Sequence, residues 1–195
     1  MEEFTIANPP VHFNLLIAKT QEMGFSMRSD ELTGSFLRTL TASKPGGRIL
    51  ELGTGTGFAL SWIISGMDEK TSVTSIDNDP EVLAVATQYF GADKRVEIIC
   101  QDGFDWIKNY DGPGFDLIFA DAWPGKFYLL NETLDLLNTG GFYLIDDLAP
   151  QDNWPVGHIE KVESLIEELE GIESLQLTRI NWSTGLILAS KKTIK

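Results

Sequence analysis

The fold of this chain is decided by residues 48–57, which read RILELGTGTG. A short, mostly apolar strand runs here directly into three glycines at every second position, Gly53, Gly55 and Gly57. Glycine permits a sharp turn and a close approach of the backbone to a ligand, because it has no Cβ atom. We therefore expect a strand, then a turn at the edge of a sheet, then a helix.

Further strands are predicted on both sides of helical segments along the rest of the chain. Short apolar runs with β-branched or aromatic residues occur at 72–76, 96–100, 115–119 and 141–145. Two more runs, 175–180 and 185–190, flank a turn at 181–184 and predict an antiparallel pair.

The segments between the strands have helical periodicity. Asp79 followed by Pro80 predicts a helix N-terminus, and Gly91 a helix end. A second helix is predicted after Phe127, with apolar positions Leu130, Leu134 and Leu137 and a stop at Gly140 and Gly141. A third is predicted over 156–170, with an apolar stripe of Val156, Ile159, Val162, Ile166 and Leu169.

Strands that alternate with helices predict an α/β fold: a doubly wound, mostly parallel sheet of seven strands, with the last strand antiparallel. Weaker helical patterns at 11–23 and 30–41 precede the first strand. We expect a single domain over residues 1–195, with 1–47 as a helical cap and 48–195 as the α/β core.

Composition favours a cytoplasmic protein with a small-molecule partner. In 195 residues, 29 acidic and 15 basic side chains give a net charge of −14, which disfavours nucleic acid and anionic membranes as partners. The single cysteine, Cys100, excludes an intramolecular disulfide. The N-terminal residues lack the pattern of a signal peptide, and no apolar run approaches the length of a membrane span. We therefore expect neither of these segments. The oligomeric state stays open, and a homodimer is one of the open states.

Acidic residues lie at or just after the C-terminal ends of five predicted strands. They are Glu51, Asp77, Asp102, Asp121 and the pair Asp146–Asp147. Ligands of open α/β sheets bind at the carboxyl ends of the strands, so this row predicts a ligand site. The alternative for Asp146 and Asp147 is that they cap a helix or pair with a basic residue.

The glycine turn does not have the spacing of the common nucleotide loops. The dinucleotide fingerprint needs glycine or alanine where this chain has Phe58, and no Lys-Ser or Lys-Thr follows as in a P-loop. An NAD-dependent oxidoreductase is therefore disfavoured. Glycines surrounded by acids suit a ligand with hydroxyl groups and a positive charge.

Four motifs in order resemble those of class I S-adenosylmethionine-dependent methyltransferases. They are ELGTGTG at 51–57, IDN at 76–78, QDG at 101–103 and FADA at 119–122. Within that superfamily, the catechol and caffeoyl-CoA type O-methyltransferases are similar in MRSDE at 27–31, GSFL at 34–37, DAW at 121–123 and the acidic pair at 146–147. The resemblance implies a Rossmann-like methyltransferase fold.

The resemblance also implies which residues bind S-adenosylmethionine. The set is Glu51, Gly53, Thr54, Gly55, Gly57, Asp77, Asn78, Asp102, Gly103 and Asp121. In it, Asp77 accepts hydrogen bonds from the ribose hydroxyls and Asp102 from the adenine amino group. The acceptor implied is a small phenolic or catechol-like molecule.

The same resemblance implies a divalent cation at Asp121, Asp146 and Asp147. Oxygen ligands suit Mg²⁺, or Ca²⁺ and Mn²⁺. The chain departs from the family in two places: Asp147 stands where the family has Asn, and Pro124 where it has a candidate base lysine. The candidate catalytic residues are then Asp121, Lys126 and Asp147, with His158 as another base.

Two alternatives remain open at this point. One is a metal-independent methyltransferase that acts on another small acceptor. The other is a non-catalytic module that binds the cofactor and acts through a partner. An RNA methyltransferase is disfavoured by the charge.

Overall fold

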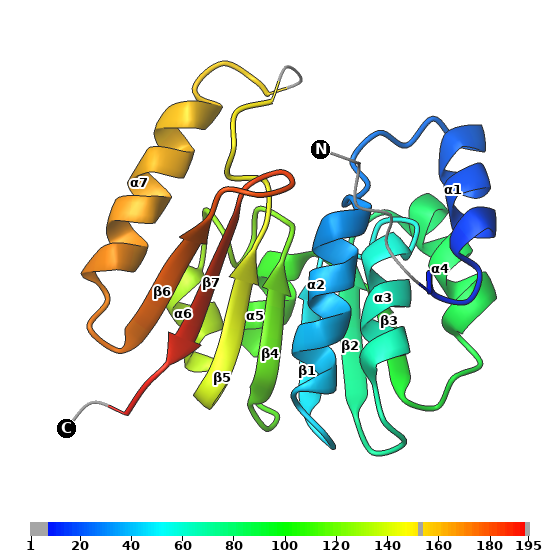
Figure 1. Ribbon diagram of the computed structural model, residues 1–195, viewed down its shortest axis with the longest axis horizontal. Coiled ribbons are helices and arrows are strands. Elements are labelled where there is room, and N and C mark those ends of the chain that lie inside the picture. The colour runs from blue at the N-terminus through cyan, green and yellow to red at the C-terminus, as the bar shows by residue number, and fades with distance from the viewer. Residues whose placement is uncertain (1–7, 152–153, 194–195) are drawn as a thin grey trace.

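A seven-stranded sheet forms the centre of the molecule, a computed structural model that describes residues 8–151 and 154–193 (Figure 1). Its strands lie in the order β3-β2-β1-β4-β5-β7-β6. Their bounds are β1 Arg48–Leu52, β2 Ser72–Asp77, β3 Val96–Cys100, β4 Phe115–Ala120, β5 Leu137–Ile145, β6 Leu175–Ile180 and β7 Leu186–Lys191.

Every strand pair is parallel except the two pairs that involve β7, which lies between β5 and β6. The predicted α/β class, the mostly parallel sheet of seven strands and the antiparallel last strand are confirmed. The chain moves outward from β1 to β3 and then returns to place β4 on the other side of β1. The switch point of the sheet therefore lies between β1 and β4.

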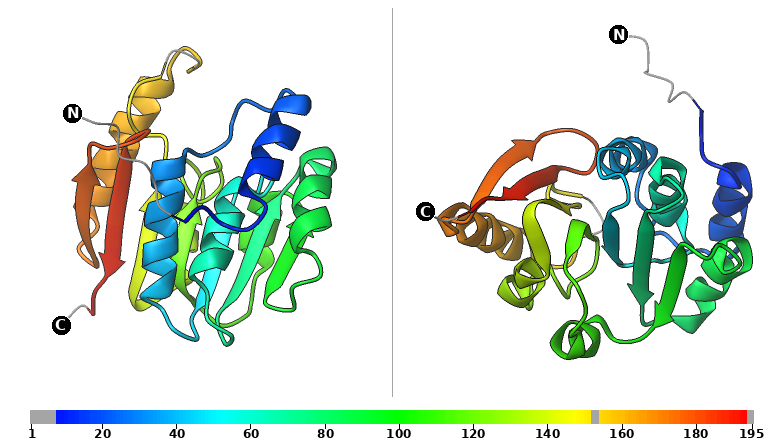
Figure 2. Two further views of the ribbon diagram at one scale, coloured as in Figure 1. Left: turned by 45° about the vertical axis from the view of Figure 1, so that its right-hand side comes forward. Right: turned by 90° about the horizontal axis from the view of Figure 1, so that it is seen from below.

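Helices cover both faces of the sheet (Figure 2). Their bounds are α1 Phe13–Glu22, α2 Glu31–Ala42, α3 Phe58–Gly66, α4 Pro80–Phe90, α5 Gly103–Asn109, α6 Leu130–Asp135 and α7 His158–Gly171. Alternate strand residues face the two layers: Ile49 belongs to the core under α1–α4, and Leu50 to the core under α5–α7. A sheet buried on both faces explains why its strands read as continuous apolar runs.

The helix predicted after Phe127 is shorter than its pattern indicates. Leu137 was expected on that helix, but α6 ends at Asp135 and Leu137 begins β5, where it pairs with Phe115. A register shift between Phe115 and Leu117 accommodates the extra residues of β5. The prediction is wrong because Leu137 is buried in both arrangements, so its hydrophobicity does not distinguish them.

The predicted helix at 156–170 begins two residues late. Gly157 adopts φ 85° as its N-cap, so Val156 lies outside the helix and is fully exposed. Ile159 is half exposed, whereas Val162 and Leu169 of the predicted stripe are buried, together with His158 and Leu165. Ile159, in the first turn of α7, is therefore not part of the hydrophobic core.

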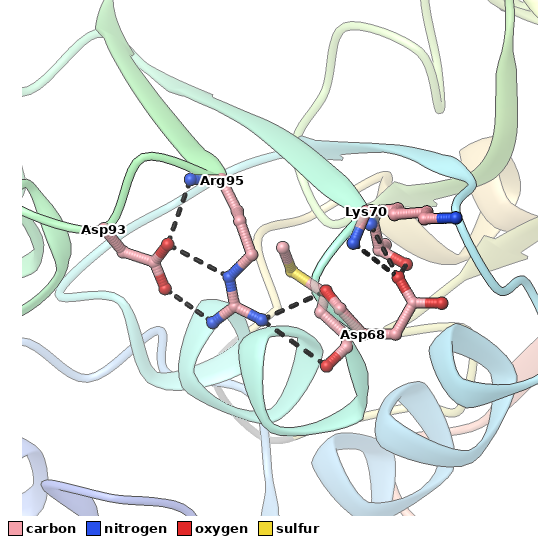
Figure 3. Close-up of polar contacts among 6 residues, drawn as sticks. Asp68, Lys70, Asp93 and Arg95 are labelled. Atoms are coloured by element: carbon pink, nitrogen blue, oxygen red, sulfur yellow. Dashed lines mark hydrogen bonds and ion pairs between the residues drawn. The ribbon is translucent and has the colours of Figure 1, made fainter.

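Polar side chains hold the loops at the amino ends of the strands, far from the switch-point edge (Figure 3). Arg95 donates to both carboxylate oxygens of Asp93, at 2.6 and 3.0 Å, and to the backbone carbonyls of Met67 and Asp68. Asp68 accepts from the backbone of Lys70, and its pKa is lowered mainly by that hydrogen bond. These contacts are structural.

None of the described helices is long and apolar enough to cross a membrane.

Helices α2 and α3 pack closely through Gly34. A Cβ atom on Gly34 would lie 2.3 Å from Cδ1 of the fully buried Trp62. We expect Gly34→Ala to lower the free energy of unfolding by about 1–3 kcal/mol, because the buried ring has no room to move. Gly171→Ala is the matched control, since nothing lies within 4 Å of its Cβ position. Urea unfolding measures both, and a stable Gly34→Ala would contradict the close packing.

Candidate active site

A cavity of about 480 Å³ lies at the carboxyl ends of β1, β2, β3 and β4, at the upper edge of the sheet in Figure 1. The segments that follow these strands line it, at 52–56, 76–79, 102–104 and 121–124. Phe58 and Ala59 of α3 complete the floor, and residues from the α1–α2 connection cover it. The cavity therefore lies at the switch point, where the row of strand-end acids predicts a ligand site.

The glycine turn forms the floor of this cavity. Gly53, Gly55 and Gly57 all have positive φ, at 102°, 51° and 87°, which side-chain-bearing residues rarely adopt. A Cβ on Gly53 would lie 2.8 Å from the carbonyl oxygen of Asp121, so the turn packs tightly against the end of β4. Gly57 does not line the cavity; its Cβ position faces Ala86 of α4 at 2.9 Å.

Glu51 supports the turn from below and does not line the cavity. It is fully buried, and the Ser75 hydroxyl donates to one of its carboxyl oxygens while lying 2.6 Å from the Thr54 hydroxyl. The other oxygen, Oε1, has no partner among the described residues. Burial raises the pKa of Glu51 to about 8. Glu51 is therefore protonated at neutral pH, although the sequence suggests a charged cofactor ligand.

Asp77 and Asp102 line the cavity together with Asn78 and Gly103, as predicted for cofactor ligands. Asp77 accepts from the backbone N–H of Gly55 at 2.8 Å, so it also holds the glycine turn. Asp102 caps α5 by accepting from the backbone N–H of Phe104 at 2.8 Å. A carboxylate has about four lone-pair sites, so both side chains retain acceptor capacity for a ligand.

Asp121 lines the same cavity from the end of β4. The Ser29 hydroxyl donates to its Oδ2 at 2.8 Å. Burial raises the pKa of Asp121 well above its usual value, and the negative charges of Asp146 and Asp147 raise it further. The three aspartates predicted at this edge therefore interact electrostatically, and Asp121 holds a proton more readily than an exposed aspartate.

Asp146 and Asp147 follow β5 and do not line the cavity. Asp146 is buried and accepts from the Thr184 hydroxyl and from the backbone N–H of Asp147; burial raises its pKa to about 6. Asp147 has φ 58° and accepts from the Gln151 side chain at 2.7 Å. Both carboxylates thus already have partners within the chain.

Lys126 and His158, the candidate bases, are buried outside the cavity. Lys126 donates from Nζ to the backbone carbonyl of Asp146 at 2.5 Å and lines a smaller cavity of about 310 Å³ beside α7. The His158 ring lies between Trp154 and Phe127, with centroid distances of 4.5 and 5.2 Å. Burial and the nearby lysines lower the pKa of His158, so it is neutral at neutral pH.

The predicted cation site does not fit an ion in this arrangement. Asp121, Asp146 and Asp147 supply suitable oxygen ligands. However, Asp146 and Asp147 do not line the cavity with Asp121, and the described part of the chain has no three His, Cys, Asp or Glu side chains grouped to hold an ion.

The connection between α1 and α2 contributes residues that the sequence did not assign to the site. Phe25, Met27, Arg28 and Ser29 line the cavity. Three of these belong to the MRSDE stretch at 27–31, whose resemblance to the family was the available signal. None of the described residues of the loop at 148–158 lines the cavity, and Asp152 and Asn153 lie outside the described residues.

Comparison with known proteins identifies the family. A family model described as O-methyltransferase matches residues 4–181, which is most of the chain. The chain belongs to the O-methyltransferase family. The resemblance to class I S-adenosylmethionine-dependent O-methyltransferases is thereby confirmed. A protein of Mycobacterium leprae, whose name assigns it provisionally as an O-methyltransferase, is 30% identical over 128 residues; the match covers 62% of this chain and 57% of that relative.

Solved structures share the fold of this O-methyltransferase family member at low sequence identity. The O-methyltransferase from Bacillus cereus, in complex with S-adenosylhomocysteine, has a TM-score of 0.84 at 18% identity, over 96% of this chain and 94% of that one. The O-methyltransferase TomG from Streptomyces achromogenes, in complex with S-adenosylmethionine, has a TM-score of 0.82 at 20% identity, over 95% and 92%. These likenesses support the Rossmann-like methyltransferase fold.

The buried carboxyl of Glu51 makes a testable contribution to stability. Between its ordinary pKa of 4.5 and its folded pKa of about 8, the unfolded chain has released this proton while the folded chain keeps it. The free energy of unfolding therefore falls as pH rises through this window, by on the order of 5 kcal/mol for this group. In Glu51→Gln the contribution is absent, so its stability relative to wild type grows from pH 5 to pH 8. Urea unfolding across that range measures the difference, and parallel profiles would contradict the buried neutral carboxyl.

Proposed function

We propose that this chain transfers the methyl group of S-adenosylmethionine to a hydroxyl of a small phenolic acceptor. The observation that carries the proposal is one cavity at the switch point whose floor is the glycine turn and whose wall includes Asp77, Asp102 and Asp121. The bound S-adenosylhomocysteine and S-adenosylmethionine of the two solved structures support the same cofactor here.

The cavity has the groups that the cofactor needs. Asp77 accepts hydrogen bonds from the ribose hydroxyls, and Asp102 from the adenine amino group. The backbone of the glycine turn passes below the methionyl part of the cofactor, because no Cβ atom intervenes at Gly53 or Gly55. The nearby carboxylates favour the positively charged sulfonium.

The mouth of the cavity suits an aromatic acceptor. Met27 and Trp123 line the cavity and are 74% and 46% exposed, so they present apolar surface to a ligand that enters it. The Lys161 ammonium lies 4.2 Å from the Trp123 ring centroid on α7's side of the mouth. A flat ring packs against such side chains, while its hydroxyl lies near the polar end of the cavity.

Asp121 is the proposed base for the transfer. It is the only one of the candidate catalytic residues Asp121, Lys126 and Asp147 that lines the cavity. The acceptor oxygen attacks the methyl carbon as the methyl–sulfur bond breaks, the hydroxyl proton passes to Asp121, and S-adenosylhomocysteine remains. The raised pKa of Asp121 favours its role as proton acceptor. Holding the two reactants in line supplies the rest of the acceleration.

Binding and turnover of the wild type and of Asp121→Asn test the proposal together. We expect wild type to bind S-adenosylmethionine in calorimetry and to methylate members of a catechol and phenol panel. We expect Asp121→Asn to retain S-adenosylhomocysteine binding and to lose about 10²–10⁴-fold in kcat, because it removes the proton acceptor.

The control is Asp105→Asn, which changes an exposed aspartate of α5 that does not line the cavity. It should leave binding and turnover unchanged. A wild type that binds the cofactor but methylates no acceptor would favour the non-catalytic module, and a wild type that binds no cofactor would refute the proposal.

The cation-assisted form of the reaction, which the family resemblance predicts, has its own test. Turnover is measured in excess EDTA and again after Mg²⁺ is restored. The assisted form requires loss of turnover in EDTA and recovery with Mg²⁺. Turnover that persists in EDTA would support the metal-independent alternative, in which Asp121 and the positioning of the reactants are sufficient.

A further inference from the structure

Arg28 is the single positively charged side chain among the residues that line the cavity. Four aspartates line the same space: Asp77, Asp79, Asp102 and Asp121. A cavity with this excess of carboxylates suits a cationic ligand group and repels an anionic one. A ligand that carries both charges needs a local cation for its anionic end, and in the described lining only Arg28 supplies one.

The guanidinium of Arg28 is held at the α3 end of the cavity without an acidic partner. Its central carbon lies 4.4 Å from the ring centroid of Phe58, the first residue of α3. Arg28 makes no hydrogen bond or ion pair within the described part of the chain, and its side chain is exposed. This contact with the Phe58 ring helps to position the guanidinium and leaves its N–H donors available.

Phe58 is the first residue of α3 and lines the cavity. The first turn of a helix carries the positive end of the helix dipole, which attracts anions. An anionic ligand group at this end of the cavity would therefore be attracted both by Arg28 and by the start of α3.

The segment that carries Arg28 is anchored to the cavity on both sides. Ser29 donates to Asp121 at 2.8 Å, and the Phe25 ring covers Gly55, whose Cβ position lies 3.1 Å from it. The Thr20 hydroxyl at the end of α1 lies 2.7 Å from the Thr56 hydroxyl in the glycine turn. Arg28 is thus positioned by contacts on either side of it in sequence and is not a side chain on an unattached loop.

We propose that Arg28 binds the carboxylate of the amino-acid end of the cofactor. This inference rests on the proposed function, because it takes S-adenosylmethionine as the ligand of the cavity. The fork of guanidinium N–H groups matches the two oxygens of a carboxylate, and the charged hydrogen bonds replace the repulsion that the four aspartates impose. In this arrangement Arg28 binds the anionic end of the cofactor, and the aspartates bind its ribose, adenine and sulfonium.

Two ligands that differ by one carboxylate test the assignment. S-adenosylhomocysteine has the complete amino-acid end, whereas S-adenosyl-3-thiopropylamine retains the amine and lacks the carboxylate. Calorimetry of the full chain should show that Arg28→Gln weakens S-adenosylhomocysteine binding about tenfold to hundredfold. Binding of the decarboxylated ligand should stay within about twofold or tighten, because its amine gains nothing from a guanidinium.

Two further variants act as controls. Asp77→Asn should weaken both ligands alike, because both contain the ribose. Arg38→Gln removes another arginine that stacks on an aromatic ring of α3, 5.1 Å from the Trp62 centroid, but Arg38 does not line the cavity. It should leave the affinity for both ligands unchanged.

The outcomes separate this inference from the proposed function. If Arg28→Gln weakens both ligands equally, Arg28 only shapes the cavity and the assignment is overturned. Unchanged S-adenosylhomocysteine affinity in Arg28→Gln overturns it as well. If the wild type binds neither ligand, the proposed function has failed and the inference falls with it.

Discussion

The backbone leaves strand β1 through three glycines with positive φ, and the remaining parts of the site are arranged around that turn. Asp77, at the end of the neighbouring strand β2, accepts from the Gly55 N–H and so ties the turn to the sheet. Asp121, at the end of β4 on the other side, presents its backbone to Gly53 at a distance that only glycine tolerates. The turn thus joins the strands on both sides of β1 and opens the cavity at the switch point between β1 and β4.

Strands with a short apolar run bounded by polar residues could be predicted from the sequence, because a doubly covered sheet requires continuous apolar stretches. The glycine turn could also be predicted, because its residue type follows from the backbone conformation. Leu137 could not be assigned, since a buried position on a helix and a buried position on a strand make the same demand on hydrophobicity. The start of α7 was misplaced for a related reason: exposed Val156 and Ile159 continue an apolar period beyond the part of the helix that touches the sheet.

Whether a predicted site residue lines the cavity depends on its position along its strand. Asp77 ends β2 and Asp121 follows β4, so both reach the edge and line the cavity. Glu51 stands one residue before the end of β1, pairs in register with Ser75, and is enclosed between sheet and helices. Asp77 and Asp121 lie two residues beyond Ser75 and Phe119, the register partners of Glu51, so the three acids differ in how far they reach toward the edge and not in side-chain direction. A motif match does not distinguish these depths. The position of the Lys126 ammonium depends on the path of its loop, which residue spacing does not determine. In the structure the ammonium donates to the backbone carbonyl of Asp146.

The row of acids at the strand ends therefore carries less negative charge than its composition indicates. Glu51, with a pKa of about 8, is neutral at neutral pH, and burial raises the pKa of Asp146 to about 6. Asp121 is shifted in the same direction by burial and by its acidic neighbours. Burial thus removes the charge of Glu51 behind the cavity and makes Asp121 in its wall easier to protonate, while Asp77 and Asp102 also line the cavity. The lining of the cavity therefore includes the hydrogen-bond acceptors Asp77 and Asp102, the proposed base Asp121 and the cation of Arg28. This combination suits a ligand that carries a positive charge at one atom and a negative charge at another.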